Sequence, residues 1–162
     1  MKNIKKIDDE LILQNGKIID PLNQKSFFKD VYLKNGKITK SNNVSKKAKI
    51  IDCSGKIITH GFCDLRSHFR EPGKEDMETL ESGSNAAMAG GFTRVCVMPN
   101  TNPPLDSPEL INFIIKKAEN CPINIHPIGA VTKMLKGQSI AEMSLMYEQG
   151  AVAFSDDNLP IQ

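Results

Sequence analysis

The sequence of 162 residues predicts an α/β protein in which a small β subdomain precedes a parallel sheet. Short β-rich runs with Asn-Gly or Ser-Gly turns fill residues 1–54, and strand and helix patterns alternate over residues 55–162. The alternating units are roughly 30 residues long, which is typical of βαβ units. We therefore expect two parts, with the boundary near residue 54.

The first part contains two similar β-rich segments, LILQNGKIID and VYLKNGKITK. Asn-Gly is the strongest short signal for a hairpin, so we expect a hairpin turn at both Asn15-Gly16 and Asn35-Gly36. A third β-like run, KIIDCSGKII, carries a Ser-Gly turn. The charged N-terminus shows neither a signal-peptide core nor a membrane span, which predicts a cytoplasmic protein.

The second part has four apolar runs that alternate with three helical patterns. Ser107 and Pro108 form a helix start, and Gly90-Gly91 form a helix stop. The expected strands are KIITHGFCDL and residues 93–99, 123–131 and 151–154, and the expected helices are ETLESGSNAAMAGG, SPELINFIIKKAEN and IAEMSLMYEQG.

The charge pattern argues against a nucleic-acid or anionic membrane partner. Lys and Arg total 21 against 19 Asp and Glu, and the basic residues are scattered rather than clustered. The four cysteines form no CxxC pair, so we expect free thiols. A small neutral or acidic molecule is the expected ligand.

Polar side chains collect where the expected parallel strands end, and that edge of an α/β sheet carries the chemistry. Along a continuing strand, alternate side chains share a face. His68 is then either a metal ligand or a structural histidine, and Asn100 either binds a carboxylate or amide of a ligand or forms a turn. The Asp156-Asp157 pair suits a divalent cation or caps a turn. The residues that would share the first face are Asp64, Arg66, His68 and Arg70.

Three motifs in this order, GFCDLRSHFREPG, AGGFTRVCVMPNTNPPLD and GAVAFSDDN, resemble the dihydroorotases of the amidohydrolase superfamily, in particular the bacterial long-chain type. The resemblance covers essentially the whole chain. It implies the N-terminal half of a TIM-type (β/α)8 barrel, preceded by a small β-sandwich segment and ending after the fourth strand. It also implies a hydrolase of cyclic amides that interconverts carbamoyl aspartate and dihydroorotate in pyrimidine synthesis, with one or two zinc ions.

The resemblance also assigns roles to individual residues. His68 matches the second histidine of the family's His-x-His metal pair, and Asp156 matches a metal-ligating aspartate, with Asp157 left open as the alternative. Arg70 and Asn100 match residues that bind the substrate carboxylate. The general base and the remaining ligands are expected on later barrel strands, so no catalytic residue is assigned within this chain.

Arg66 departs from the family pattern, because it stands where the first histidine of the pair is usual. A guanidinium group stays protonated and offers no lone pair to a metal. This substitution favours a second hypothesis, a non-catalytic dihydroorotase-like subunit that supports aspartate transcarbamoylase. Homo-oligomerisation is a further possibility, since half a barrel leaves strand edges unpaired.

Overall fold

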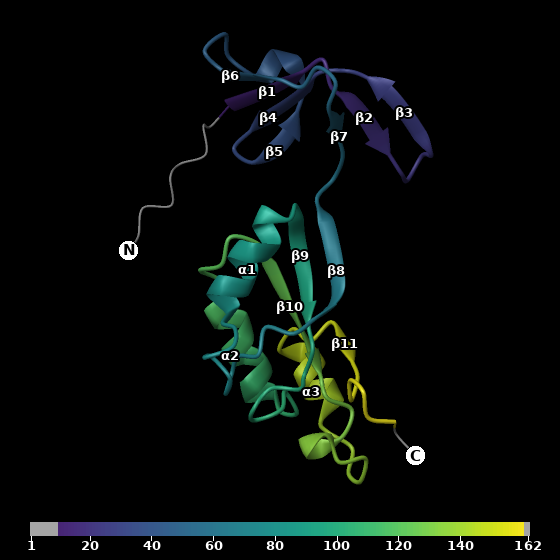
Figure 1. Ribbon diagram of the computed structural model, residues 1–162, viewed down its shortest axis with the longest axis vertical. Helices are drawn as coiled ribbons and strands as arrows, with labels where there is room; N and C mark the ends of the chain where they lie inside the picture. Colours follow the sequence, from purple (N-terminus) through teal and green to yellow (C-terminus); the bar gives the residue numbers. More distant parts are fainter. Residues whose placement is uncertain (1–9, 161–162) are drawn as a thin grey trace. The chain divides into compact units, whose positions relative to one another are not determined.

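The structure is a computed structural model that describes residues 10–160 (Figure 1). Residues 1–9, on which the expectation about a signal peptide rests, lie outside the described residues. The chain divides into two compact units between His60 and Gly61. This division falls a few residues after the expected boundary, because β7 (Ile57–Ile58) pairs in parallel with β2 (Lys17–Asp20) of the first unit.

The first unit contains two small sheets. One has the order β5-β4-β1-β6 and the other β3-β2-β7. The hairpin expected at Asn35-Gly36 is confirmed, since β4 and β5 pair antiparallel on either side of it. A cavity of about 740 Å³ is lined by apolar side chains of both sheets, including Ile18, Phe27 and Ile38. The remaining elements are β1 (Glu10–Gln14), β3 (Lys25–Phe28), β4 (Val31–Lys34), β5 (Lys37–Thr39), β6 (Lys49–Asp52) and a 3-10 turn, η1 (Ser41–Asn43).

The prediction of a hairpin at Asn15-Gly16 is wrong. The strands on either side of this turn, β1 and β2, lie in different sheets. Asn15 has a φ of 64° and its side-chain amide donates to Asp52, 3.1 Å away. A side chain at Gly16 would overlap Ile58. Asn15 thus supplies the left-handed backbone, and here the chain uses it to pass from one sheet to the other.

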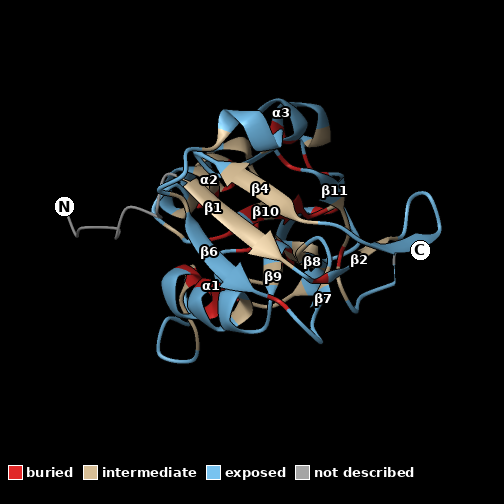
Figure 2. Ribbon diagram, turned by 90° about the horizontal axis from the view of Figure 1, so that it is seen from above, coloured by how far each residue is buried: buried red, intermediate tan, exposed pale blue. Residues whose placement is uncertain are grey.

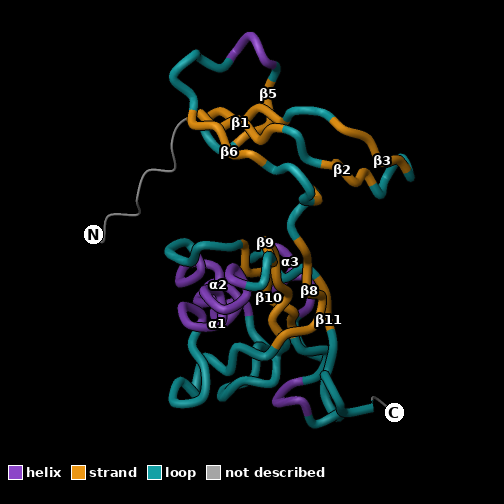
Figure 3. Tube along the Cα trace, turned by 45° about the horizontal axis from the view of Figure 1, so that its top comes forward, coloured by secondary structure: helices purple, strands orange, loops and turns teal. Residues whose placement is uncertain are grey.

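The second unit is an α/β structure with a four-stranded parallel sheet in chain order, β8-β9-β10-β11. The predicted alternation of strands and helices is therefore confirmed. Long loops follow the strands (Figure 3). The strands are β8 (Phe62–Ser67), β9 (Phe92–Val97), β10 (Asn124–Gly129) and β11 (Ala153–Phe154), and the helices are α1 (Leu80–Ala89), α2 (Pro108–Ala118), α3 (Met143–Glu148) and the short η2 (Lys133–Leu135).

The core of this unit lies between the sheet and the helices. Helix α1 packs on β9 and α2 packs on β10, and Figure 2 shows buried positions on α1 and around β10. One apolar cluster joins them, and its fully buried members include Leu80, Val95, Ile111, Ile114 and Met146. No helix within residues 10–160 is long and apolar enough to cross a membrane.

Helix α3 is shorter than the expected helix of residues 140–150. Ile140 forms a bridge with Thr132, and the Ala141 amide donates to the Val131 carbonyl, 2.8 Å away. These contacts hold the chain extended, so the helix begins only at Met143.

The loop after β8 is anchored by a buried carboxylate. Glu71 is 2% exposed, and its Oε2 accepts a hydrogen bond of 2.7 Å from the amide of Leu80, the first residue of α1. Its Oε1 pairs with Lys117 of α2. A negative charge at a helix N-terminus is favourable, so Glu71 ties the loop to both helices.

This loop also lies directly against the loop after β9. The Asn102 amide donates to the Pro72 carbonyl, 2.9 Å away, and a side chain at Gly73 would overlap the Asn102 backbone. The segments that carry His68 and Asn100 therefore hold each other in place.

We expect Lys117→Met to lower the free energy of unfolding, because it leaves Glu71 buried without its cation. Loss of one partner of a fully buried pair costs about 3–5 kcal/mol, and because half of the Lys117 side chain is exposed we expect about 2 kcal/mol. Urea unfolding would measure it. Lys116→Met on the same helix is the matched control, and an equal loss in both variants would contradict this role for Glu71.

We also expect the chain to self-associate through strand β8, which lies at the edge of its sheet. Phe62 and Leu65 on this strand are 52% and 72% exposed. Leu65→Lys should reduce the associated fraction in sedimentation velocity, because a lysine on an edge strand opposes pairing with another strand. Leu145→Lys, at an exposed leucine on α3, should leave it unchanged. A monomeric unmodified chain would refute the expectation.

Candidate functional site

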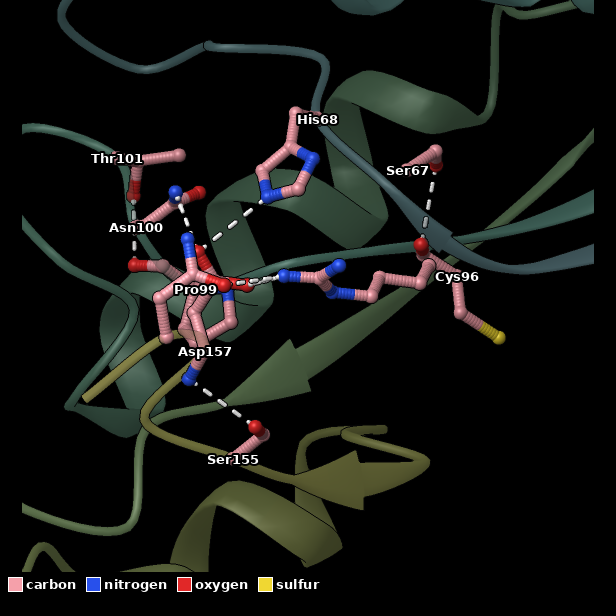
Figure 4. Close-up of polar contacts among 10 residues, drawn as sticks. Ser67, His68, Cys96, Pro99, Asn100, Thr101, Ser155 and Asp157 are labelled. Atoms are coloured by element: carbon pink, nitrogen blue, oxygen red, sulfur yellow. Dashed lines mark hydrogen bonds and ion pairs between the residues drawn. The ribbon is translucent and has the colours of Figure 1, made fainter. Parts of the chain in front are cut away.

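The polar site is built around the carboxylate of Asp157, in the loop after β11 (Figure 4). This side chain is 4% exposed. Its Oδ1 accepts from Arg66 Nη2 at 3.0 Å. Its Oδ2 accepts from Asn100 Nδ2 at 2.8 Å and lies 3.3 Å from His68 Nε2. Residues from the carboxyl ends of three strands, β8, β9 and β11, thus meet at one carboxylate.

The end of β8 determines which of its polar residues reach this point. The pairing of β8 with β9 shifts between Asp64 and Ser67, and Asp64 Oδ1 accepts from the Arg66 amide at 2.9 Å. Strict alternation is therefore broken, and the expected shared face of four polar residues is only partly present. Arg66 and His68 both contact Asp157, whereas Asp64 bonds to the backbone of its own strand.

Arg70 lies beyond the strand and has a left-handed backbone, with a φ of 62°. Its direction is therefore set by the loop and not by strand alternation. Neighbouring Phe69 and Glu71 are buried and fix this turn. Among the described residues, the Arg70 side chain has no hydrogen bond or ion pair with another residue, so its guanidinium group remains available to a ligand.

Asn100 follows β9 and is partly buried. One hydrogen of its amide bonds to Asp157. The amide nitrogen carries a second hydrogen and the oxygen is an acceptor, so Asn100 can still bind a ligand. The structure places Asn100 with His68 and Asp157, but it does not bring Arg70 into contact with them.

Asp156 does not lie beside His68. Its Oδ1 accepts from the backbone amides of Val131 and Thr132, at 2.8 and 3.0 Å, and its Oδ2 accepts from the Thr132 hydroxyl. It is 4% exposed. Both oxygens thus hold the loop after β10, and the structure places the adjacent Asp157 in the position that was expected for Asp156.

The backbone conformation at Asp157 explains why Asp157, and not Asp156, lies beside His68. Asp157 has a φ of 57°, and its amide donates to Ser155 Oγ at 3.0 Å. Aspartate tolerates the left-handed region better than most residues, and this turn directs the two carboxylates to different partners. Asn158, which was not among the predicted site residues, also contacts the cluster, because its Oδ1 accepts from Arg66 Nη2 at 2.5 Å. The polar run SDDN was the available signal.

The described residues do not by themselves fit a metal ion. No group of three His, Cys, Asp or Glu side chains suited to a metal occurs within residues 10–160. His68 and Asp157 are two candidate donors, but the Arg66 guanidinium group contacts one oxygen of Asp157. Burial raises the pKa of Cys96 on β9, and nearby Cys63 and Asp64 add to the effect.

Known proteins similar to this chain include two dihydroorotases. The chain is 44% identical to a dihydroorotase of Solibacter usitatus and 43% identical to one of Pelotomaculum thermopropionicum, over 93% and 94% of its length. It spans 36% of each of these relatives.

A solved structure of similar fold is the L-hydantoinase (dihydropyrimidinase) of Arthrobacter aurescens, with a TM-score of 0.73 at 23% identity. It matches 89% of this chain, which covers 32% of that structure. A family model described as dihydro-orotase-like matches residues 55–162. From this match and the identity to two dihydroorotases, the chain belongs to the dihydroorotase-like family.

Proposed function

We propose that the chain is the N-terminal part of a cytoplasmic dihydroorotase, which interconverts carbamoyl aspartate and dihydroorotate in pyrimidine synthesis. The observation that carries the proposal is the meeting of His68, Asn100 and Asp157 at the carboxyl edge of a parallel sheet. Similarity to relatives named dihydroorotase along nearly the whole chain supports it. In this proposal the first unit is the β-sandwich segment and the second is the first half of the barrel.

Arg70 and Asn100 are the proposed groups for the substrate carboxylate. A guanidinium group can bind a carboxylate through two parallel hydrogen bonds. Arg70 has no competing partner among the described residues, and Asn100 retains one amide hydrogen beside Asp157. Together they would orient the substrate so that its amide faces the Asp157 cluster.

The side chains that could contribute to a zinc site are His68 and Asp157, in place of His68 and Asp156, and Arg66 would have to release Asp157 first. Asp157 replaces Asp156 because Asp156 uses both of its oxygens in the loop after β10. Zinc sites use at least three protein ligands, so two donors are insufficient without further residues. No general base is assigned among the residues of this chain.

One observation favours the second candidate function, a non-catalytic subunit that binds aspartate transcarbamoylase. Arg66 takes the place of a metal-ligating histidine and pairs with Asp157. In that case the full-length protein would bind the transcarbamoylase and show no hydrolysis of dihydroorotate.

We expect the 162-residue chain alone to show no turnover of carbamoyl aspartate or dihydroorotate. The reason is that its described residues bring together only two candidate metal donors, His68 and Asp157, and include no assigned general base. The measurement is hydrolysis and ring closure by purified chain with added zinc, next to a His68→Ala control. Activity above that control would refute the expectation.

In a full-length protein that contains this chain, we expect Arg70→Gln to impair dihydroorotate hydrolysis selectively. Loss of a charged partner to a bound carboxylate costs about 2–5 kcal/mol, so kcat/KM should fall on the order of 100-fold. Dihydrouracil is the same ring without the carboxylate, and its hydrolysis should change by less than about 3-fold.

The matched control for this comparison is Arg94→Gln, at an exposed arginine of β9. It should leave the hydrolysis of both substrates unchanged. An equal fall in kcat/KM for both substrates in Arg70→Gln would mean that Arg70 is not the carboxylate-binding residue. If the unmodified protein hydrolyses neither substrate, the non-catalytic function is favoured.

A further inference from the structure

We propose that Arg66 is the resident cation of this site, whose guanidinium group neutralises Asp157 and holds the cluster together without a metal ion. The inference concerns assembly of the site and does not require the hydrolase activity proposed above. It rests on the burial of Asp157, on the partners of its two oxygens and on the anchoring of Arg66.

The buried carboxylate of Asp157 requires a counter-charge. Its side chain is 4% exposed, and a carboxylate removed from water needs a compensating charge and hydrogen bonds. Of its side-chain partners, Asn100 is neutral and His68 is charged only when protonated. Arg66 alone among these partners carries a permanent positive charge.

Hydrogen bonds hold Arg66 at both its backbone and its guanidinium group. Its backbone amide is fixed by Asp64 Oδ1 at 2.9 Å, at the irregularity in β8. Its Nη2 donates both to Asp157 Oδ1 and to Asn158 Oδ1. Hydrogen bonds at the backbone amide and at the guanidinium group therefore direct the Arg66 side chain toward Asp157, although 56% of the side chain remains exposed.

Arg66 competes with a metal ion for Asp157. Arg66 contacts Oδ1 of Asp157, and Asn100 and His68 contact Oδ2, so both carboxylate oxygens are engaged. A cation bound by Asp157 and His68 would lie close to the guanidinium charge and be repelled by it. The ion pair therefore replaces the metal and also opposes its binding.

The test uses thermal unfolding of the full 162-residue chain by circular dichroism, at low protein concentration, with and without zinc. All proteins carry Cys63→Ser, because this exposed thiol could bind zinc independently of the site. We compare the otherwise unmodified chain with Arg66→Gln, Arg66→His and, as the matched control, Arg94→Gln.

Zinc should leave the midpoint of the unmodified chain unchanged, because its site already contains a cation. Arg66→Gln should lower the midpoint by about 4 °C, and the control should not. Arg66→His supplies a ligand and removes the repulsion, so zinc at about 100 times its Kd should raise the midpoint of this variant by about 5 °C or more.

Two results would overturn the inference. One is a zinc-induced rise in the unmodified chain equal to that of Arg66→His, which would mean that Arg66 does not oppose a metal. The other is a midpoint for Arg66→Gln equal to that of Arg94→Gln, which would mean that Arg66 does not stabilise Asp157.

If Arg66→Gln does not fold, the double variant Arg66→Gln/Asp157→Asn decides the question. It removes both charges, and Asp157→Asn keeps the size of the buried side chain. Recovery of a cooperative transition would support the ion pair as the missing element, and failure to recover would count against it.

Discussion

Burial of one carboxylate, that of Asp157, constrains the arrangement of the site. A charged group with so little contact with water is stable only if other groups approach it closely. The groups that do so are Arg66, His68 and Asn100, which come from the ends of β8 and β9. The arrangement of the loops at this edge therefore depends on the hydrogen bonds and the counter-charge that Asp157 needs, as well as on the apolar core.

Two further buried carboxylates, those of Glu71 and Asp156, hold the neighbouring loops in place. Glu71 accepts from the first amide of α1 and pairs with Lys117 of α2, so the loop after β8 is fixed to both helices. Asp156 binds the amides of the loop after β10. Each carboxylate accepts hydrogen bonds that the backbone would otherwise leave unmade, and each links segments distant in sequence.

The regular elements of the second unit could be predicted because they depend on local signals. Apolar β-branched runs indicated β9 and β10, and the Ser107-Pro108 start placed α2 correctly. The turn at Asn15-Gly16 could not be predicted as a crossing between sheets, because its dihedral preference is the same in both cases. Only contacts with Asp52 and Ile58 distinguish them.

The site was predictable as a group of segments, but not residue by residue. His68 and Asn100 do meet an aspartate of the SDDN run. Which aspartate could not be read from the sequence, since the choice depends on the left-handed backbone at Asp157. The position of Arg70 was missed for the same kind of reason, because strand alternation ends at Ser67.

The close approach of Gly73 to the Asn102 backbone limits which changes these two loops can accept. Any side chain at Gly73 would displace the segment that also carries Asn100, and an insertion in either loop would separate the Asn102 amide from the Pro72 carbonyl. The two loops therefore form one packed unit, in which a change of length or bulk on one side would require a compensating change on the other.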